Sequence, residues 1–147
     1  MPAKGAELRP AAAADAAAVF ALVEQLGEDY QPNRTAFDRA FSEAIADPDR
    51  HLLLVASEAS GALVGYALTT VARLLYTNGE SAQLQELVVD ERARNRGIGS
   101  QLVSAVEDAC RRRGVRQLTV ASSRGASFYE RLDYRSTADF LKKNFTE

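Results

Sequence analysis

The sequence predicts one mixed α/β domain, and two observations lead to that prediction. Apolar residues alternate between the two-residue repeat of strands and the 3.6-residue repeat of helices, in the order β-α-α-β-β-β-α-β-α-β. An apolar strand ends at Val89, and a basic loop with two glycines leads from it into an amphipathic helix that begins at Ile98. The length of 147 residues suffices for one hydrophobic core, so we expect a single domain over residues 1–147.

The first half of the chain is expected to contain four strands and two helices. Thr35 is a fair N-cap for the second helix, which must stop before Pro48 because the residue before a proline disfavours helical backbone. Asn78-Gly79 is a strong hairpin signal between two apolar segments. The expected elements are a strand at 7–9 that Pro10 ends, a helix at 15–26 that stops at Gly27, a helix from about residue 35, and strands at 51–57, 63–71 and 82–89.

The second half is expected to contain two helices and two strands. Apolar residues recur at helical spacing from Ile98 to Ala109, and three arginines followed by Gly114 favour a helix C-terminus, because cations complement the helix dipole there. The remaining expected elements are a strand at 115–121, a short helix at 126–132 and a last strand at 137–145.

The loop that precedes residue 98 has the composition of a phosphate-binding loop. A helix N-terminus presents unpaired backbone N–H groups and a partial positive charge, which favour a phosphate. Gly97 and Gly99 leave the backbone open to a ligand, while Arg94 and Arg96 supply charge and forked donors. No Lys follows Gly99 as a Walker loop requires, and the spacing is not the Gly-x-Gly-x-x-Gly of a Rossmann fold. The loop therefore predicts pyrophosphate binding of another kind, with an ordinary turn and solvated arginines as the alternative.

Two segments of the chain resemble a known family. The first is Arg94-Asn95-Arg96-Gly97-Ile98-Gly99, which resembles the Gln/Arg-x-x-Gly-x-Gly/Ala acetyl-CoA motif of the GNAT superfamily of N-acetyltransferases. The second is Phe128-Tyr129-Glu130-Arg131-Leu132-Asp133-Tyr134, which resembles the family's Phe-Tyr-Glu-(Lys/Arg)-Leu-Gly-(Phe/Tyr) segment. Asp133 replaces the family's glycine, and aspartate enters the left-handed backbone region more readily than most residues. On both segments, in the family's order, the chain is identified as a member of that superfamily.

The resemblance implies the details of the fold and the donor site. It implies a central mixed, mostly antiparallel sheet whose fourth and fifth strands splay apart, flanked by about four helices. Acetyl-CoA, as co-substrate, would lie between those two strands, with its pantetheine arm along the fourth strand and its pyrophosphate on the loop. The cofactor-binding residues so implied are Leu87, Val88, Val89, Arg94, Asn95, Arg96, Gly97, Ile98, Gly99, Ser100 and Ser122, with Ser123 an equal contender for the contact of Ser122.

Two residues are candidates for the chemistry of acetyl transfer. Tyr129 is the candidate acid, because a phenol with a pKa of about 10 stays protonated at neutral pH and can donate to the departing thiolate, as the family commonly uses this Tyr. Glu86 is the candidate base, because it is the only acid inside the fourth strand. Alternation along the strand puts Glu86 on the face of the sheet opposite to that of Gln83 and Gln85. A β-bulge could change the face to which Glu86 points, so the face that meets the substrate stays open. Packing of Tyr129 beside Phe128 and a structural ion pair of Glu86 are the alternatives.

Composition excludes several other classes of function. The single histidine, His51, is expected to open a strand, and the single cysteine, Cys110, to be buried and inert, so neither a metal site nor a disulfide framework is expected. The net charge of −2 argues against a nucleic-acid partner, and the arginines at 111–113 are better explained by the helix end. No stretch approaches transmembrane length without charges, so we expect a cytoplasmic protein without a membrane partner.

The leading hypothesis for function is an N-acetyltransferase. It would move an acetyl group from acetyl-CoA to a primary amine on a small molecule, a peptide or a protein, by direct transfer in a ternary complex. The alternative is a non-catalytic acetyl-CoA-binding or interaction module on the same fold. The resemblance implies that the loops at 28–30 and 76–80 select the acceptor. The two acids and the tyrosine at 28–30 could receive a cationic amine, with a solvated acidic loop as the alternative. The identity of the amine stays open, as does a homodimer.

Overall fold

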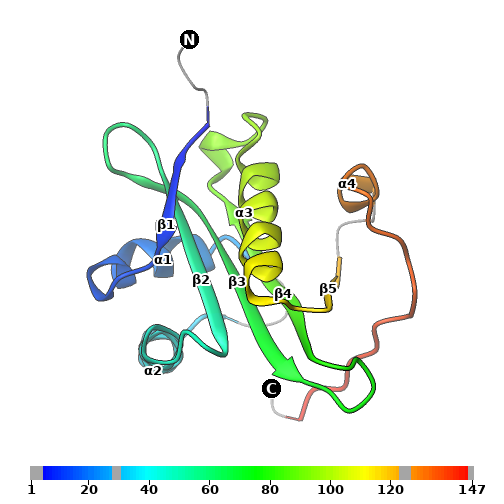
Figure 1. Cartoon of the computed structure of the whole chain (residues 1–147). Helices are drawn as coiled ribbons and strands as arrows, with labels where there is room; N and C mark the ends of the chain where they lie inside the picture. The colour runs from blue at the N-terminus through cyan, green and yellow to red at the C-terminus, as the bar shows by residue number, and fades with distance from the viewer. Residues whose placement is uncertain (1–4, 28–30, 123–126, 146–147) are drawn as a thin grey trace.

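A computed structural model describes residues 5–27, 31–122 and 127–145 of the chain. Over these residues the strands form one five-stranded sheet in the order β1-β2-β3-β4-β5 (Figure 1). The strands are β1 (Glu7–Pro10), β2 (His51–Ser57), β3 (Leu63–Arg73), β4 (Glu80–Val89) and β5 (Gln117–Val120). Neighbours from β1 to β4 are antiparallel, and β5 is parallel to β4. This arrangement confirms the predicted mixed, mostly antiparallel sheet.

Helices cover both faces of the sheet, and each face has its own apolar core. The helices are α1 (Ala16–Val23), α2 (Arg34–Ala46), α3 (Ile98–Arg113) and α4 (Ser127–Glu130), with short 3-10 turns η1 (Ala13–Asp15) and η2 (Glu91–Ala93). Tyr66 and Val88 belong to the core under α1 and α2, whereas Ala67 and Leu84 belong to the core under α3. Neighbouring strand residues thus alternate between the two cores, as the pleat of a strand requires.

A β-bulge interrupts the pairing of β3 with β4. Leu68 pairs with Glu86, but the next residue of β3, Thr69, pairs with Leu84, so Gln85 is the extra residue on β4. The bulge restarts the alternation along β4. As a result Leu84 and Leu87 both pack against the α3 core although three positions separate them. The side of the sheet that each β4 residue faces therefore changes at Gln85.

The ends of α2 and α3 follow from local hydrogen bonds. The prediction that Thr35 caps α2 is wrong, because Asn33, two residues earlier, is the N-cap and its side-chain oxygen accepts from the N–H of Ala36 at 2.9 Å. At the end of α3, Gly114 takes a left-handed conformation with φ 77°, as predicted. Arg111 in the last turn pairs with two acids of its own helix, which agrees with the interpretation of the arginine run as a helix end.

The last predicted strand, at 137–145, is wrong for the residues that the structure describes. Residues 135–145 form no strand, and Phe140, Leu141 and Phe145 are exposed. Phe140 and Leu141 are neighbours rather than alternating, and two lysines follow them, so no single face of this segment could be apolar. The predicted hairpin is confirmed, since β3 and β4 are antiparallel neighbours and the connection at 74–79 contains Asn78-Gly79. No helix in the described part of the chain is long and apolar enough to cross a membrane.

Candidate active site

A pocket opens where β5 leaves β4. The two strands pair only from Ser81 to Leu84, whereas β3 accompanies β4 as far as Val89. Among the described residues, no strand occupies the outer edge of residues 85–89, which is the predicted splay. The pocket has a volume of about 520 Å³, within the usual range for a small-molecule site. Its walls are Gln25, Leu26, Leu84 to Val89, Arg94, Gly99, Val120 to Ser122, Ser127 to Tyr129 and Lys142.

The structure brings most of the predicted site residues to this pocket. Both catalytic candidates, Glu86 and Tyr129, line it. So do six of the predicted cofactor-binding residues, namely Leu87, Val88, Val89, Arg94, Gly99 and Ser122. Asn95, Arg96, Gly97, Ile98 and Ser100 do not line it, although Gly97 and Ser100 flank the pocket residue Gly99 closely. Ser123 and the loop at 28–30 lie outside the described residues, and residues 76–80 are not part of the pocket wall.

The backbone between β4 and α3 has the conformation that a phosphate-binding loop needs. Gly97 is the N-cap of α3 with φ 78°, a conformation that side-chain-bearing residues adopt rarely. A Cβ atom built on Gly97 would meet nothing within 4 Å, so the space beside it is open. The N–H of Gln101 bonds to the carbonyl of Gly97, which leaves the preceding N–H groups without a helical acceptor. Ile98, by contrast, is only 1% exposed and packs in the core.

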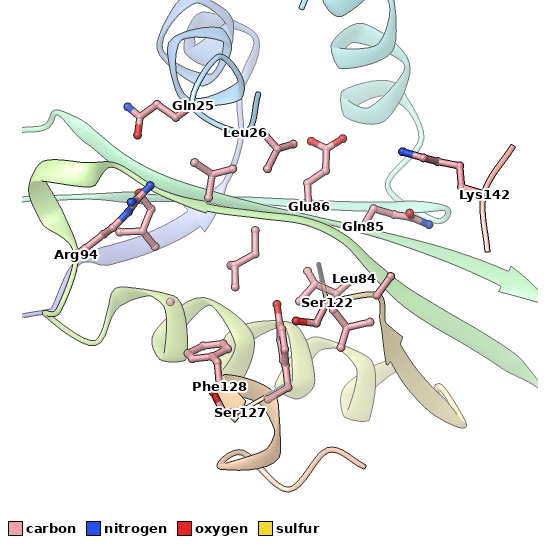
Figure 2. A pocket seen from close by; sticks show the side chains of 17 residues that line it. Gln25, Leu26, Leu84, Gln85, Glu86, Arg94, Ser122, Ser127, Phe128 and Lys142 are labelled. Atoms are coloured by element: carbon pink, nitrogen blue, oxygen red, sulfur yellow. The ribbon is translucent and has the colours of Figure 1, made fainter. Parts of the chain in front are cut away.

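The two arginines of the loop point to different partners. Arg94 lines the pocket, and its Nε donates to the carbonyl oxygen of Val89 at 3.2 Å, so the side chain turns back along the end of β4 (Figure 2). Arg96 instead forms an ion pair with Glu58 of the β2–β3 loop, with 3.2 Å between Nη2 and Oε1. Arg94 is therefore the arginine that this conformation presents to a ligand.

The helix that carries Tyr129 is short but closed by a regular C-terminal motif. The N–H of Tyr134 bonds to the carbonyl of Tyr129, and that of Asp133 bonds to the carbonyl of Glu130, which is a Schellman motif. Asp133 has φ 72°, so it adopts the left-handed conformation of the glycine that it replaces. The ring of Tyr129 packs edge-on against Phe128 and Tyr134, at centroid distances of 4.9 and 5.7 Å. Burial raises the pKa of Tyr129, which keeps its hydroxyl protonated and able to donate.

Glu86 faces the side of the sheet that α1 and α2 cover. Figure 2 shows its side chain above β4 with those of Gln25 and Leu26, while Phe128 and Ser127 lie below. The hydroxyl of Tyr66 donates to its Oε1 at 2.7 Å. Sequence reasoning missed Tyr66, although a tyrosine inside an apolar strand was a usable signal, because a buried hydroxyl needs a polar partner.

Further polar side chains surround Glu86 on this side of β4. The bulge residue Gln85 donates from Nε2 to the hydroxyl of Thr70 at 2.9 Å. Gln25 accepts the N–H of Glu91 at 3.1 Å, which ties the chain after α1 to the end of β4. Lys142, from the C-terminal segment, extends toward Glu86 and Gln85 in Figure 2. In Figure 2 the carboxylate of Glu86 thus lies between the amide of Gln25 on one side and the amide of Gln85 and the ammonium group of Lys142 on the other.

The remaining candidate residues of the sequence are structural. His51 is the first residue of β2, and its Nδ1 lies 3.2 Å from the carbonyl oxygen of Asp47. Cys110 is 7% exposed in the α3 core, and burial raises the pKa of its thiol, so it is a poor nucleophile. Within the described ranges, no group of three or more His, Cys, Asp or Glu side chains could hold a metal ion.

Comparisons with known proteins agree with this geometry. The family described as acetyltransferase (GNAT) domain matches residues 22–146. Glucosamine 6-phosphate N-acetyltransferase 1 of Oryza sativa subsp. japonica is 33% identical over 110 residues, which are 73% of this chain and 67% of that protein. Glucosamine 6-phosphate N-acetyltransferase of Arabidopsis thaliana is 25% identical over 112 residues, which are 74% of this chain and 75% of that protein.

The fold is also that of solved structures. The crystal structure of glucosamine-6-phosphate N-acetyltransferase from Arabidopsis thaliana aligns with a TM-score of 0.83 and 24% identity, over 95% of this chain and 98% of that chain. The family match spans most of the chain and includes the whole pocket wall, from Gln25 to Lys142. The protein therefore belongs to the GNAT family and is an acetyltransferase.

Proposed function

We propose that the protein is an N-acetyltransferase that moves the acetyl group of acetyl-CoA to a primary amine, by direct transfer in a ternary complex. The observation that supports it most is that Glu86 and Tyr129, the proposed base and acid, line one pocket at the edge of β4 beside which the described residues place no strand. A base and an acid in the same cavity suit this reaction, because the attacking amine must lose a proton and the departing thiolate must gain one.

The residues at the donor side fit acetyl-CoA. The unpaired edge of residues 87–89 offers main-chain groups to the pantetheine arm, as a neighbouring strand would. The pyrophosphate would meet the free N–H groups at the start of α3, the open side of Gly97, and the guanidinium of Arg94. Asn95, Arg96, Ile98, Ser100 and Ser122 remain proposed contacts of this co-substrate.

In the proposed reaction the amine nitrogen attacks the thioester carbonyl carbon, so that a C–N bond forms and the C–S bond breaks. Glu86 takes the proton that the amine must lose, directly or through water. Tyr129 gives its proton to the departing thiolate sulfur, and the product leaves as the amide and the free thiol. Burial raises the pKa of Tyr129, so the phenol is protonated at neutral pH and the acid form that the step requires is present.

We further infer that the acceptor is a small-molecule amine that also carries an anionic group. Glu86 would attract the ammonium form of the amine, and Lys142 on the same side would attract the anion. The names of the rice and Arabidopsis relatives point to one such compound, glucosamine 6-phosphate. A peptide or protein amine is the rival acceptor, and a non-catalytic acetyl-CoA-binding module is the rival function.

A thiol-release assay with acetyl-CoA and a panel of amines tests the proposal. The panel includes glucosamine 6-phosphate, glucosamine, amino acids, polyamines and lysine peptides. We expect turnover, with glucosamine 6-phosphate favoured over glucosamine, and this preference should fall in Lys142→Gln but not in the neighbouring control Lys143→Gln. Acetyl-CoA binding without turnover on any amine would support the module instead. An equal preference in both lysine variants would remove Lys142 from acceptor recognition.

Two further expectations remain proposals. A cytoplasmic location is tested by fractionation of cells that express the protein. A homodimer would cover some of the exposed apolar side chains of the C-terminal segment, such as Phe140 and Leu141. Sedimentation of the purified protein measures its mass, and a monomer at all concentrations would contradict the dimer.

A further inference from the structure

The hydroxyl of Tyr66 is the one polar atom of a side chain that otherwise packs in an apolar core. Tyr66 is 1% exposed and lies in β3 opposite Val88. The ring packs in the core beneath α1 and α2, among residues such as Val19, Leu22 and Phe41. Such packing fixes the ring, and therefore also the position of the hydroxyl at its tip.

That fixed hydroxyl meets the candidate base. It donates to Oε1 of Glu86 at 2.7 Å, a distance typical of a strong O–H···O⁻ hydrogen bond. The strand register brings the two side chains close together. Leu68 of β3 pairs with Glu86, and Tyr66 lies two residues before Leu68 on the same face of the sheet. Tyr66 thus occupies Oε1 of Glu86, which leaves Oε2 as the oxygen that would accept the proton of the amine.

The bond has a fixed direction. Burial, and the charge of Glu86, raise the pKa of Tyr66 far above its usual range, so Tyr66 stays the donor and Glu86 the acceptor. A donor to a carboxylate favours the ionised form, which is the form that can accept a proton. The other charged or titratable side chains of the described pocket wall are Arg94, Tyr129 and Lys142, and Lys142 extends toward Glu86.

We propose that Tyr66 is a positioning residue, whose hydroxyl donates to the Glu86 carboxylate and holds it in place. This inference rests on the proposed function, in which Glu86 removes the proton of the amine. Tyr66 itself lies beneath the pocket wall and acts only through Glu86. The bulge at Gln85 makes the arrangement possible, because it turns Glu86 to the face that holds Tyr66.

The test is the variant Tyr66→Phe, which keeps the ring and removes only the hydroxyl. The variant thus removes a donor of the kind that favours the ionised form of a carboxylate. The acidic limb of the pH profile of kcat/KM should then move to higher pH by about one unit, the size expected for a hydrogen bond to a charged group. Carbon-13 NMR titration of the labelled Glu86 carboxyl, assigned by its loss in Glu86→Gln, should show the same shift without any need for turnover.

Tyr134→Phe is the matched control, because Tyr134 makes the same kind of bond, 2.6 Å long, to Glu107. It should leave the acidic limb and the Glu86 titration in place. If Glu86→Gln abolishes the limb while Tyr66→Phe moves neither the limb nor the carboxyl titration, the inference is overturned and the proposed function stands. If Glu86→Gln keeps the wild-type limb, Glu86 is not the base, and this inference is overturned together with that role, whereas turnover of acetyl-CoA with an amine tests the acetyltransferase function separately.

Discussion

The two sides of β4 at the pocket are built in different ways. On the donor side the contacts that we propose come from main-chain groups of residues 87–89, from the first turn of α3, and from the side chain of Arg94. On the acceptor side they come from the side chains of Glu86, Gln85 and Lys142, supported by Tyr66 of β3. The donor side is thus a short continuous segment with a defined backbone, whereas the acceptor side is assembled from parts of the chain that lie far apart.

This difference explains how much each side depends on the identity of its residues. More than one residue type can adopt the left-handed backbone conformation found at Gly97 and Asp133, since Asp133 adopts it without being a glycine. The contact between Tyr66 and Glu86, in contrast, requires a particular side chain, because the hydrogen bond needs a hydroxyl group within bonding distance of the carboxylate. We therefore expect substitutions on the acceptor side to act on the chemistry, and substitutions on the donor side to act on binding or on folding. Tyr129 is the exception on the donor side.

The largest effect is expected from Tyr129→Phe, which tests that exception. Loss of a general acid should lower kcat by about 10²–10⁴-fold, while acetyl-CoA affinity measured by calorimetry should stay near that of the wild type. Because burial raises the pKa of Tyr129, any alkaline limb that it causes should lie above about pH 10, and should be absent from the variant. An unchanged kcat with chemistry shown to be rate-limiting would exclude Tyr129 as the acid.

Glu86→Gln is expected to have the next largest effect, on the acceptor side. It should lower kcat/KM by about 10²-fold and flatten the acidic limb, because that limb reports the free base. A purely structural Glu86 would behave differently: the variant would melt at a lower temperature and keep the wild-type pH profile. Both quantities are measured on one preparation. An unaltered acidic limb would transfer the proton to water or to another residue.

A smaller effect is expected from the arginines of the donor side. Arg94→Ala removes donors from the pocket and should weaken acetyl-CoA binding by about 10-fold or more, as the loss of a charge-assisted hydrogen bond does. Arg96→Ala removes an exposed ion pair with Glu58 and should change affinity by less than about threefold. Titration calorimetry measures the acetyl-CoA affinity of both variants. Equal losses would show that Arg96 leaves Glu58 when the co-substrate binds.

The fold was predictable from the sequence where the signals are local. α3 begins and ends at the predicted residues, Ile98 and Arg113, because a left-handed glycine flanks each end. The predicted last strand failed because strand formation depends on pairing and on an apolar face, and the described residues 137–145 neither pair with a strand nor have such a face. The N-cap of α2 was misplaced because Asn33 and Thr35 are both good caps, and only the hydrogen bond to Ala36 decides between them.

The candidate site was predictable to a different degree on each side. The loop motif and the segment around Tyr129 indicated the donor side, since each lies within a few residues of sequence. The facing of Glu86 was not predictable, because the bulge is a property of the pairing of β4 with β3 and leaves no mark in the sequence of β4 alone. Tyr66 was missed for the same reason, as its partner is 20 residues away on another strand. Contacts between strands have to be seen in three dimensions.

The smallest effect is expected at Asp133, where the donor side should depend on backbone conformation alone. A left-handed residue other than glycine carries a steric cost, so Asp133→Gly should stabilise the fold by about 0.5 kcal/mol, after allowance for the greater freedom of glycine in the unfolded chain. Asp133→Ala, which tolerates this conformation less well, should destabilise it by about 1 kcal/mol. Urea unfolding measures both changes, and kcat of the glycine variant should remain at the wild-type value because the helix of Tyr129 ends in the same motif. A fall in kcat for Asp133→Gly would mean that the aspartate side chain itself contributes to the site, and the contrast between the two sides of β4 would then be weaker than we propose.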